Sequence, residues 1–221
     1  MPSTVWIQFA KAPKLGAVKT RLAATTGQHF ALEAHNTLTL SVNKQLTNLC
    51  EKHEVGACDV WLAIAGESDA VAAAGTFYSG KGATFDRLFE QPLGDLGVRM
   101  RTLLNDGLQL YDYAFVVGSD FPVLDKPYLN AAVCALADSD LVLGPTNDGG
   151  YGLIGVNGKR GENLMPDFGD VEWGTEKVFA QTKARLNALG LCYTELEKRF
   201  DVDDEKDWNA WLSSQWYVEP I

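Results

Sequence analysis

The sequence predicts a three-layer α/β/α protein, in which helices cover both faces of a mostly parallel central sheet. Strand-like apolar runs alternate with helical patterns along most of the 221 residues, which is the order typical of α/β folds. The clearest run, YAFVVGSD at 113–120, is short and continuously apolar, as expected for a strand buried on both faces. We expect one domain over residues 1–221, since this length suits a single core.

The strands are expected where short runs rich in β-forming residues end at glycine, proline or aspartate. These runs cover residues 4–10, 59–66, 83–90, 113–120, 140–146, 151–156 and 191–196. The turn Asn147-Asp148-Gly149-Gly150 is typical of a tight connection between two neighbouring strands. In a sheet of this class, ligands bind at the carboxyl ends of the strands.

The helices are expected where apolar residues recur at helical spacing. A long helix is predicted over 25–50, and others over 94–110, 125–137, 174–189 and 201–212. Asp125 and Pro127 are typical of a helix start, because Asp caps the first turn and Pro is tolerated there.

Composition excludes several classes of function. The formal net charge of -10 argues against a nucleic-acid partner, because the surface would repel a phosphate backbone. The chain has no apolar run long enough to span a membrane and no basic residues before its first apolar run, so we expect a cytoplasmic protein without a membrane partner. The four scattered cysteines form no metal or disulfide spacing and are expected to be reduced core thiols. No histidine chemistry is expected.

The segment FAKAPKLGAVKTRL (9–22) follows the first predicted strand and concentrates positive charge. It carries Lys11, Lys14, Lys19 and Arg21, and no acidic residue precedes Glu33. Charge-assisted hydrogen bonds to phosphate contribute about 1.5–3 kcal/mol each, so this segment is a candidate site for the phosphates of a nucleotide. Its small residues, Ala10, Ala12, Gly16 and Ala17, would let the backbone approach such a ligand. The alternative is a solvated surface loop.

Two familiar phosphate motifs do not apply. The segment lacks the glycine that a Walker A loop needs immediately before Lys19. Residues 150–155, GYGLIG, fit the dinucleotide pattern G-x-G-x-x-G in letters. That pattern must open a helix, whereas this segment reads as a strand.

Carboxylates supply candidate metal ligands. Asp120 ends the clearest strand, so its side chain is expected at the edge that receives phosphates, where Mg²⁺ or Mn²⁺ would bind. The alternative is that Asp120 caps the turn beside Pro122. Near the C-terminus the acidic cluster contains Asp201, Asp203, Asp204 and Asp207. A helix N-cap and first turn explain two of these, which leaves Asp201 or Asp203 as a second metal ligand.

Other residues are candidates for contacts with the acceptor substrate. Arg99 and Arg101 follow GDLG and could bind an anion, although an exposed helical position also explains them. Asp148, Gly149 and Gly150 are turn residues that would touch substrate if the turn lies at the sheet edge. Trp173, in the glycine-containing stretch FGDVEWGT, could line a pocket or serve only in packing.

Six motifs taken together resemble a known family. FAKAPKLGAVKTRL, GDLGVRM, VGSDFPVL, LGPTNDGGYGLIG, VEWGTEKV and FDVDDEKDW occur in the order of a bacterial family of nucleotide-diphospho-sugar transferase-like proteins. Its members are often labelled glycosyltransferases, some for arsenosugar biosynthesis, and are related to molybdenum-cofactor and phospholactate guanylyltransferases. The resemblance covers nearly the whole chain and implies a GT-A type fold.

The resemblance also implies roles for residues. It places Lys11, Lys19 and Arg21 on nucleotide phosphates and Asp120 on Mg²⁺. Asp203 matches a second metal ligand of some cytidylyltransferases, although their motif V-D-T-x-x-D has threonine at the position of Asp204. The tripeptide Gly118-Ser119-Asp120 differs from the D-x-D motif of many glycosyltransferases.

We therefore expect a Mg²⁺- or Mn²⁺-dependent transferase that uses a nucleotide or sugar nucleotide and a small-molecule acceptor. Lys19 and Asp120 would act by positioning and charge stabilisation. One alternative is a nucleotidylyltransferase that joins a nucleoside triphosphate to a phosphorylated small molecule and releases pyrophosphate. A second alternative is a non-catalytic nucleotide sensor.

Overall fold

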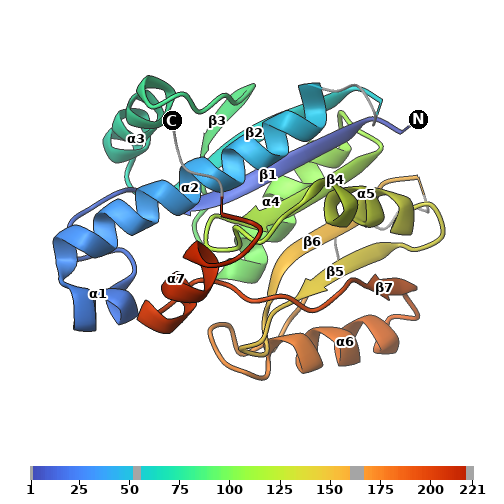
Figure 1. Ribbon diagram of the computed structural model, residues 1–221. Coiled ribbons are helices and arrows are strands. Elements are labelled where there is room, and N and C mark those ends of the chain that lie inside the picture. Colours follow the sequence, from blue (N-terminus) through green and yellow to red (C-terminus); the bar gives the residue numbers. More distant parts are fainter. Residues whose placement is uncertain (1, 52–55, 160–166, 218–221) are drawn as a thin grey trace.

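The central sheet has seven strands in the order β3-β2-β1-β4-β6-β5-β7 (Figure 1). The structure is a computed structural model that describes residues 2–51, 56–159 and 167–217. Neighbouring strands are parallel except at β6, which runs antiparallel to β4 and to β5. The mostly parallel sheet is thus confirmed. The strands are β1 (Thr4–Lys11), β2 (Cys58–Ala65), β3 (Arg87–Glu90), β4 (Tyr113–Gly118), β5 (Leu141–Pro145), β6 (Tyr151–Asn157) and β7 (Tyr193–Glu195).

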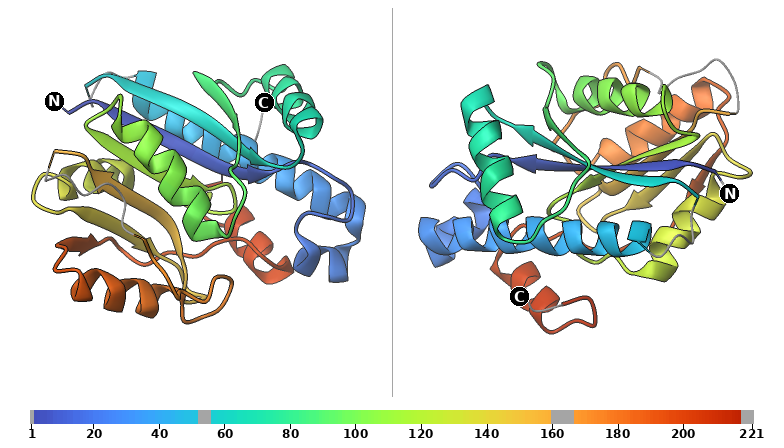
Figure 2. Two further views of the ribbon diagram at one scale, coloured as in Figure 1. Left: turned by 180° about the vertical axis from the view of Figure 1, so that it is seen from behind. Right: turned by 90° about the horizontal axis from the view of Figure 1, so that it is seen from above.

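Helices cover both faces of this sheet, as the sequence predicts. The right-hand view of Figure 2 shows α2, α5 and α7 on one face and α4 and α6 on the other. The helices are α1 (Thr20–Thr26), α2 (Gln28–Glu51), α3 (Ser68–Gly80), α4 (Leu96–Leu108), α5 (Lys126–Ala135), α6 (Val178–Ala188) and α7 (Glu205–Leu212). Asp125 caps α5 by accepting a hydrogen bond from the Tyr128 amide, which confirms the predicted helix start.

Two helices differ from the prediction. The helix expected over 25–50 is preceded by the separate helix α1, and Gly27, at φ 89°, ends α1. A positive φ suits glycine, which is why the chain can turn there. Helix α3 was not predicted, because its apolar residues are mostly small alanines and give little contrast between its faces.

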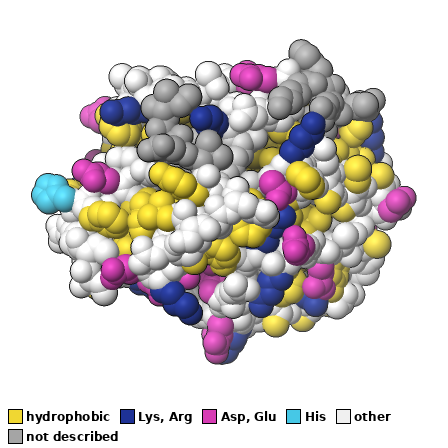
Figure 3. Space-filling view, in the orientation of Figure 1, with side chains coloured by type: hydrophobic (Ala, Val, Ile, Leu, Met, Phe, Trp, Pro, Cys, Tyr) yellow, Lys and Arg dark blue, Asp and Glu magenta, His cyan; other side chains and the backbone are white. Residues whose placement is uncertain are grey.

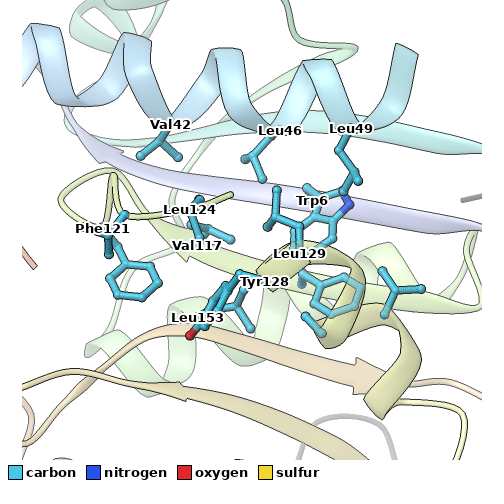
Figure 4. Close-up of a cluster of buried hydrophobic side chains, with 14 of the residues drawn as sticks. Trp6, Val42, Leu46, Leu49, Val117, Phe121, Leu124, Tyr128, Leu129 and Leu153 are labelled. Carbon is cyan, nitrogen blue, oxygen red and sulfur yellow. The ribbon is translucent and has the colours of Figure 1, made fainter. Parts of the chain in front are cut away.

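Alternate side chains of the strands enter two separate cores. On the α2 and α5 face, Trp6 and Phe115 stack with their ring centroids 4.0 Å apart, in one cluster with Leu46 and Leu129. Figure 4 shows Trp6 close to Leu46 of α2 and Leu129 of α5. On the opposite face, Val5 and other strand residues pack against α4 and α6. Because the central strands are buried on both sides, the carboxyl ends that carry the candidate site are rigidly held.

Glycines in β6 allow phenylalanine rings to pack against its backbone. A Cβ atom on Gly152 would lie 2.2 Å from the Phe121 ring, and one on Gly155 would lie 2.5 Å from Phe115. Both glycines belong to GYGLIG, which forms a strand and opens no helix. The resemblance of this segment to a dinucleotide motif therefore reflects ring packing in the core.

The prediction that the cysteines are reduced thiols in the core is wrong. Cys50, at the end of α2, and Cys58, at the start of β2, form a disulfide. Cys134 and Cys192 are exposed thiols and do not lie in the core. The disulfide could not be read from spacing, because it depends on how the end of α2 returns to the sheet, where the two Cα atoms lie 5.1 Å apart.

The surface over α2, α5 and α7 mixes both signs of charge. Figure 3 shows Lys and Arg interspersed with Asp and Glu on this face, with no continuous basic patch among its described residues. In the described part of the chain, no helix is both long and apolar enough to cross a membrane.

We predict that Gly155→Ala destabilises the fold by about 1–3 kcal/mol, because the added methyl group overpacks the Phe115 contact. Urea denaturation would measure this change. Gly80→Ala is the matched control, since a Cβ atom at Gly80 meets nothing within 4 Å. An equal effect of the two substitutions would contradict the close packing described for β6.

Candidate functional site

A cavity of about 480 Å³ lies at the carboxyl ends of the central strands. Its walls come from the ends of β1 and β4, the segment between β1 and α1, the turn between β5 and β6, and residues near Trp173 and Asp203. The position is the one expected for a ligand site in a sheet of this class. It brings together segments from both ends of the sequence.

Lys19 stands at the centre of the polar part of the cavity. Its Nζ donates hydrogen bonds to the Val202 carbonyl at 2.6 Å, to Asp203 Oδ1 at 3.1 Å and to Asp120 Oδ2 at 3.4 Å. Only 7% of the side chain is exposed. Among the residues that the structure describes, Lys19 is the one non-glycine residue with a positive φ, 45°. Such a conformation costs about 1–2 kcal/mol and is often found at functional sites.

Lys19 and Asp120 hold each other in their charged forms. Burial disfavours the ammonium group of Lys19, but Asp120 and Asp203 outweigh that effect and raise its pKa. Burial likewise opposes the charge of Asp120, yet Lys19 and backbone hydrogen bonding keep its pKa below the usual range. The cluster thus presents fixed opposite charges at the end of β4.

The residues predicted to contact phosphate do not all reach the cavity. Ala10, Lys11, Lys19 and Arg21 line it, whereas Ala12 and Gly16 lie outside its lining. Arg21 is 70% exposed and pairs with Asp203 Oδ2 at 3.1 Å. In this structure, then, Lys19 and Arg21 contact the two carboxylates that the sequence suggested as metal ligands.

The segment after β7 carries Asp201 and Asp203 to the cavity. The Val202 amide donates to the Asp120 carbonyl at 2.9 Å, which fixes the two chain segments side by side. Asp204 caps α7 and forms a capping box with Asp207, so those two carboxylates serve the helix. Asp201 and Asp203 remain, and both line the cavity.

Arg199 fixes the segment after β7, which carries Asp201 and Asp203, to the rest of the protein. Its guanidinium lies 4.1 Å from the ring centroid of Tyr128 and 5.0 Å from that of Trp216. It also pairs with Asp125 at 3.2 Å and donates to the Val123 carbonyl. Since Arg199 is buried and makes contacts on several sides, it holds the segment that bears Asp203 against the body of the protein.

Asp201 differs from its neighbours in protonation. Burial, followed by the negative charges of Asp148, Asp120 and Asp203, raises the pKa of Asp201 to about 7. Asp201 is therefore partly protonated near pH 7, whereas Asp120 is ionised.

The carboxylates of the cavity can hold a hard divalent cation only if a bound substrate supplies further oxygen ligands. Within the described residues, no group of three or more His, Cys, Asp or Glu side chains is arranged to hold a metal ion. However, Asp120 and Asp203 converge on one cation, the Lys19 ammonium. Mg²⁺ is commonly held by one or two carboxylates, with phosphate oxygens and water completing its shell. Two converging carboxylates fit that arrangement.

The candidate acceptor contacts separate into two groups. Asp148, Gly150 and Trp173 line the cavity. Asp148 Oδ1 accepts from Thr146 Oγ1 at 2.5 Å and from the Gly150 amide at 3.0 Å, so it also has the expected role in the turn. Gly149 lies outside the lining, at φ 90°, and its carbonyl accepts from the Phe179 amide in α6.

The two arginines after GDLG also lie outside the cavity lining. Arg99 donates through Nε to the Gly94 carbonyl at 2.9 Å. Arg101 pairs with Asp167 at 3.5 Å on the surface. These contacts do not support the expectation that Arg99 or Arg101 binds an anionic group of the acceptor.

Sequence reasoning missed several buried polar residues in and beside the cavity. His35 contacts the Lys11 carbonyl through Nε2 at 3.0 Å, and burial lowers the pKa of His35, so the ring is neutral and donates. Gln91 donates to the carbonyls of Ala10 and Ala63. Gln8 donates to Ser119 Oγ at 3.0 Å. One of these residues had a signal in the sequence, because Gln8 is a polar residue inside the apolar run TVWIQFA.

Comparison with known proteins supports the fold. The model of a bacterial family described as "Uncharacterized protein conserved in bacteria (DUF2064)" matches residues 48–175. No curated protein matches the chain in sequence.

Several solved structures share the fold of this chain. A "putative nucleotide-diphospho-sugar transferase" from Desulfovibrio desulfuricans G20 is 24% identical, with a TM-score of 0.81 over 98% of this chain and 93% of that one. A 4-diphosphocytidyl-2C-methyl-D-erythritol synthase from Anaerococcus prevotii is 10% identical, with a TM-score of 0.57 over 96% and 99%. A nucleotidyl transferase from Methanothermobacter thermautotrophicus is 11% identical, with a TM-score of 0.57 over 94% and 95%. The expected fold class is confirmed.

We predict that Asp201→Asn changes how stability depends on pH. Because the folded pKa of about 7 lies above the ordinary 3.8, the folded state keeps its proton to higher pH than the unfolded state. The wild type therefore loses stability as the pH rises from about 4 to 7. Asn removes this loss, so unfolding at pH 8 should cost about 1–2 kcal/mol more than in the wild type, after allowing for partial exposure.

Urea denaturation at pH 4 and pH 8 would measure this effect, which should be small at pH 4. Asp106→Asn, at an exposed position on α4, is the control. Parallel pH dependence in the wild type and Asp201→Asn would show that folding does not raise the pKa of Asp201.

Proposed function

The chain belongs to the DUF2064 family, and we propose that it is a metal-dependent transferase whose donor is a nucleotide or sugar nucleotide. The observation that carries this proposal is the cluster of Lys19, Asp120 and Asp203 at the end of the central strand β4. It combines a positive group for phosphates with two converging carboxylates. Its location in a fold shared with nucleotidyltransferases gives further support.

The donor's phosphates would lie against the segment between β1 and α1. Lys11, Lys19 and Arg21 supply the positive charges on this side of the cavity. Asp120 and Asp203 would hold Mg²⁺ or Mn²⁺, and such an ion, when bound, neutralises phosphate oxygens. Lys19 and Arg21, which pair with these carboxylates here, would then be available to the phosphates.

The chain's contribution to catalysis would be a set of charges already in position. Lys19 is held by its left-handed backbone conformation and by three oxygen acceptors. His35 and Gln91 fix the backbone carbonyls of Lys11 and Ala10. Groups fixed in advance stabilise developing charge without reorganising during the reaction. No covalent intermediate is required.

Nucleotidyl transfer is the second candidate. There, a phosphorylated acceptor attacks the α-phosphate of a nucleoside triphosphate, and pyrophosphate leaves. The observation in its favour is the set of three cations, Lys11, Lys19 and Arg21, which would suit a triphosphate and its leaving group. A nucleotide sensor without catalysis is less well supported, because base and ribose binding would not need the carboxylate pair.

We predict that Lys19→Met weakens nucleotide affinity by about 10–100-fold, because it removes a charge-assisted hydrogen bond worth about 1.5–3 kcal/mol. Isothermal titration with UDP and other nucleotides in the presence of Mg²⁺ would measure this loss. Lys14→Ala is the matched control, since Lys14 is exposed and lies outside the cavity lining. Circular dichroism would verify that both variants fold. Equal affinities of Lys19→Met and Lys14→Ala would contradict the phosphate role of Lys19.

We also predict that Asp120→Asn removes the dependence of nucleotide binding on metal. Thermal-shift measurements with nucleoside triphosphates and sugar nucleotides, with and without Mg²⁺ or Mn²⁺, would test this. The wild type should be stabilised more when metal is present, and Asp120→Asn should not. Failure of every nucleotide to stabilise the wild type would overturn the proposed function, whereas metal-independent stabilisation would favour the sensor.

A further inference from the structure

We propose that the end of the cavity opposite Lys19 binds an uncharged acceptor through an apolar face. This inference rests on the proposed function and adds the chemical class of the second substrate. It follows from the distribution of charged and apolar side chains around the cavity, from a tryptophan whose position is fixed by its neighbours, and from the pairing of the nearby cations.

Positive charge is confined to one side of the cavity. Every Lys and Arg in the described lining, namely Lys11, Lys19 and Arg21, comes from the end of β1, the segment that follows it or the first turn of α1. The opposite wall is formed by Leu96 and Met100 of α4, Tyr151 of β6, Trp173, and Val178 of α6. A ligand that spans the cavity therefore meets cations at one end and apolar side chains at the other.

Trp173 forms a fixed part of the apolar wall. A Cβ atom on Gly97 would lie 2.6 Å from Trp173 Cζ2, so the indole packs directly on the backbone of α4. Two further rings meet it at nearly right angles: Phe168 at a centroid distance of 6.0 Å and Tyr151 at 6.5 Å. Because these three contacts fix the indole of Trp173, an apolar ligand can pack against it with little loss of side-chain entropy.

The same side of the cavity is unsuited to an anion. Apart from Lys11, Arg21 and the cluster of Lys19 with Asp120 and Asp203, the charged residues of the described lining are Asp148 and Asp201, and both are acidic. The cations near these wall residues in the sequence lie outside the described lining. Arg101 pairs with Asp167, Lys177 pairs with Glu172, and Arg99 donates to the Gly94 carbonyl. A phosphate group on the acceptor would lose water and gain no opposite charge from the described lining, which is unfavourable.

Leu96, which lines the cavity, is partly open to solvent. It is 43% exposed, and its sequence neighbours Val98 and Leu93 are 46% and 91% exposed. The acceptor that fits is thus neutral, with an apolar face and polar groups that can donate to Asp148 or Asp201, such as hydroxyls.

A pair of probes that share one ring tests the inference. Phenyl β-D-glucoside is neutral and hydroxylated, whereas phenyl phosphate carries the same ring with an anion. Ligand-observed NMR titrations would be made with the wild type in the presence of UDP and Mg²⁺, so that the cationic side is occupied. We expect phenyl β-D-glucoside to bind at least about 10-fold more tightly than phenyl phosphate. Equal or tighter binding of phenyl phosphate would overturn the inference.

Two matched leucine variants locate the binding. Leu96→Asn should weaken binding of phenyl β-D-glucoside by about 5-fold or more. Leu110→Asn should not change it, because Leu110 is likewise exposed, at 55%, but lies outside the cavity lining. Trp173→Phe keeps an aromatic ring and should have a smaller effect than Trp173→Ala. Equal affinities in Leu96→Asn and Leu110→Asn would overturn the proposed location.

Titration of UDP alone separates the two proposals. If neither UDP nor any other nucleotide binds to the wild type, the proposed function fails independently of the probes. If UDP binds and the two probes are not distinguished, only the inference about the acceptor fails.

Discussion

The candidate site depends on one interaction, the contact of the Lys19 ammonium with Asp120, Asp203 and the Val202 carbonyl. These partners lie 101 to 184 residues from Lys19 in the sequence. The interaction therefore joins the segment after β1, the end of β4 and the segment before α7. Removing the lysine would leave two carboxylates without their shared cation, a costly arrangement in a partly buried site. The Lys19 ammonium and the two carboxylates therefore stabilise each other's charges.

The rest of the fold holds these groups in place. Strands buried on both faces fix Asp120 at the end of β4, and the amide of Val202 ties the C-terminal segment to the Asp120 carbonyl. Arg199 anchors that segment between Tyr128 and Trp216. The resulting cavity has two chemically different sides. The cations of its described lining come from the end of β1, the segment after it and the start of α1, while its apolar wall comes mainly from α4, β6 and α6.

The sequence predicted local features well and long-range ones poorly. Each expected strand is present, because apolar runs bounded by turn residues depend on neighbours in the chain. Helix α3 escaped prediction because its alanines lack contrast. The positions of Lys19 and Asp120 at one sheet edge were predictable, but their mutual contact was not, since it requires docking of the segment that carries Asp203. The Cys50–Cys58 disulfide and the buried role of His35 depend on tertiary structure in the same way.

Binding of Mn²⁺, followed by electron paramagnetic resonance, tests the central claim most directly. The claim is that Asp120 and Asp203, which Lys19 now bridges, exchange this cation for a divalent metal when a nucleotide supplies phosphate oxygens. Free Mn²⁺ should then fall when both UDP and the wild-type protein are present, by more than UDP alone accounts for. Asp120→Asn should abolish the additional binding. Equal Mn²⁺ binding by the wild type and Asp120→Asn would contradict the account.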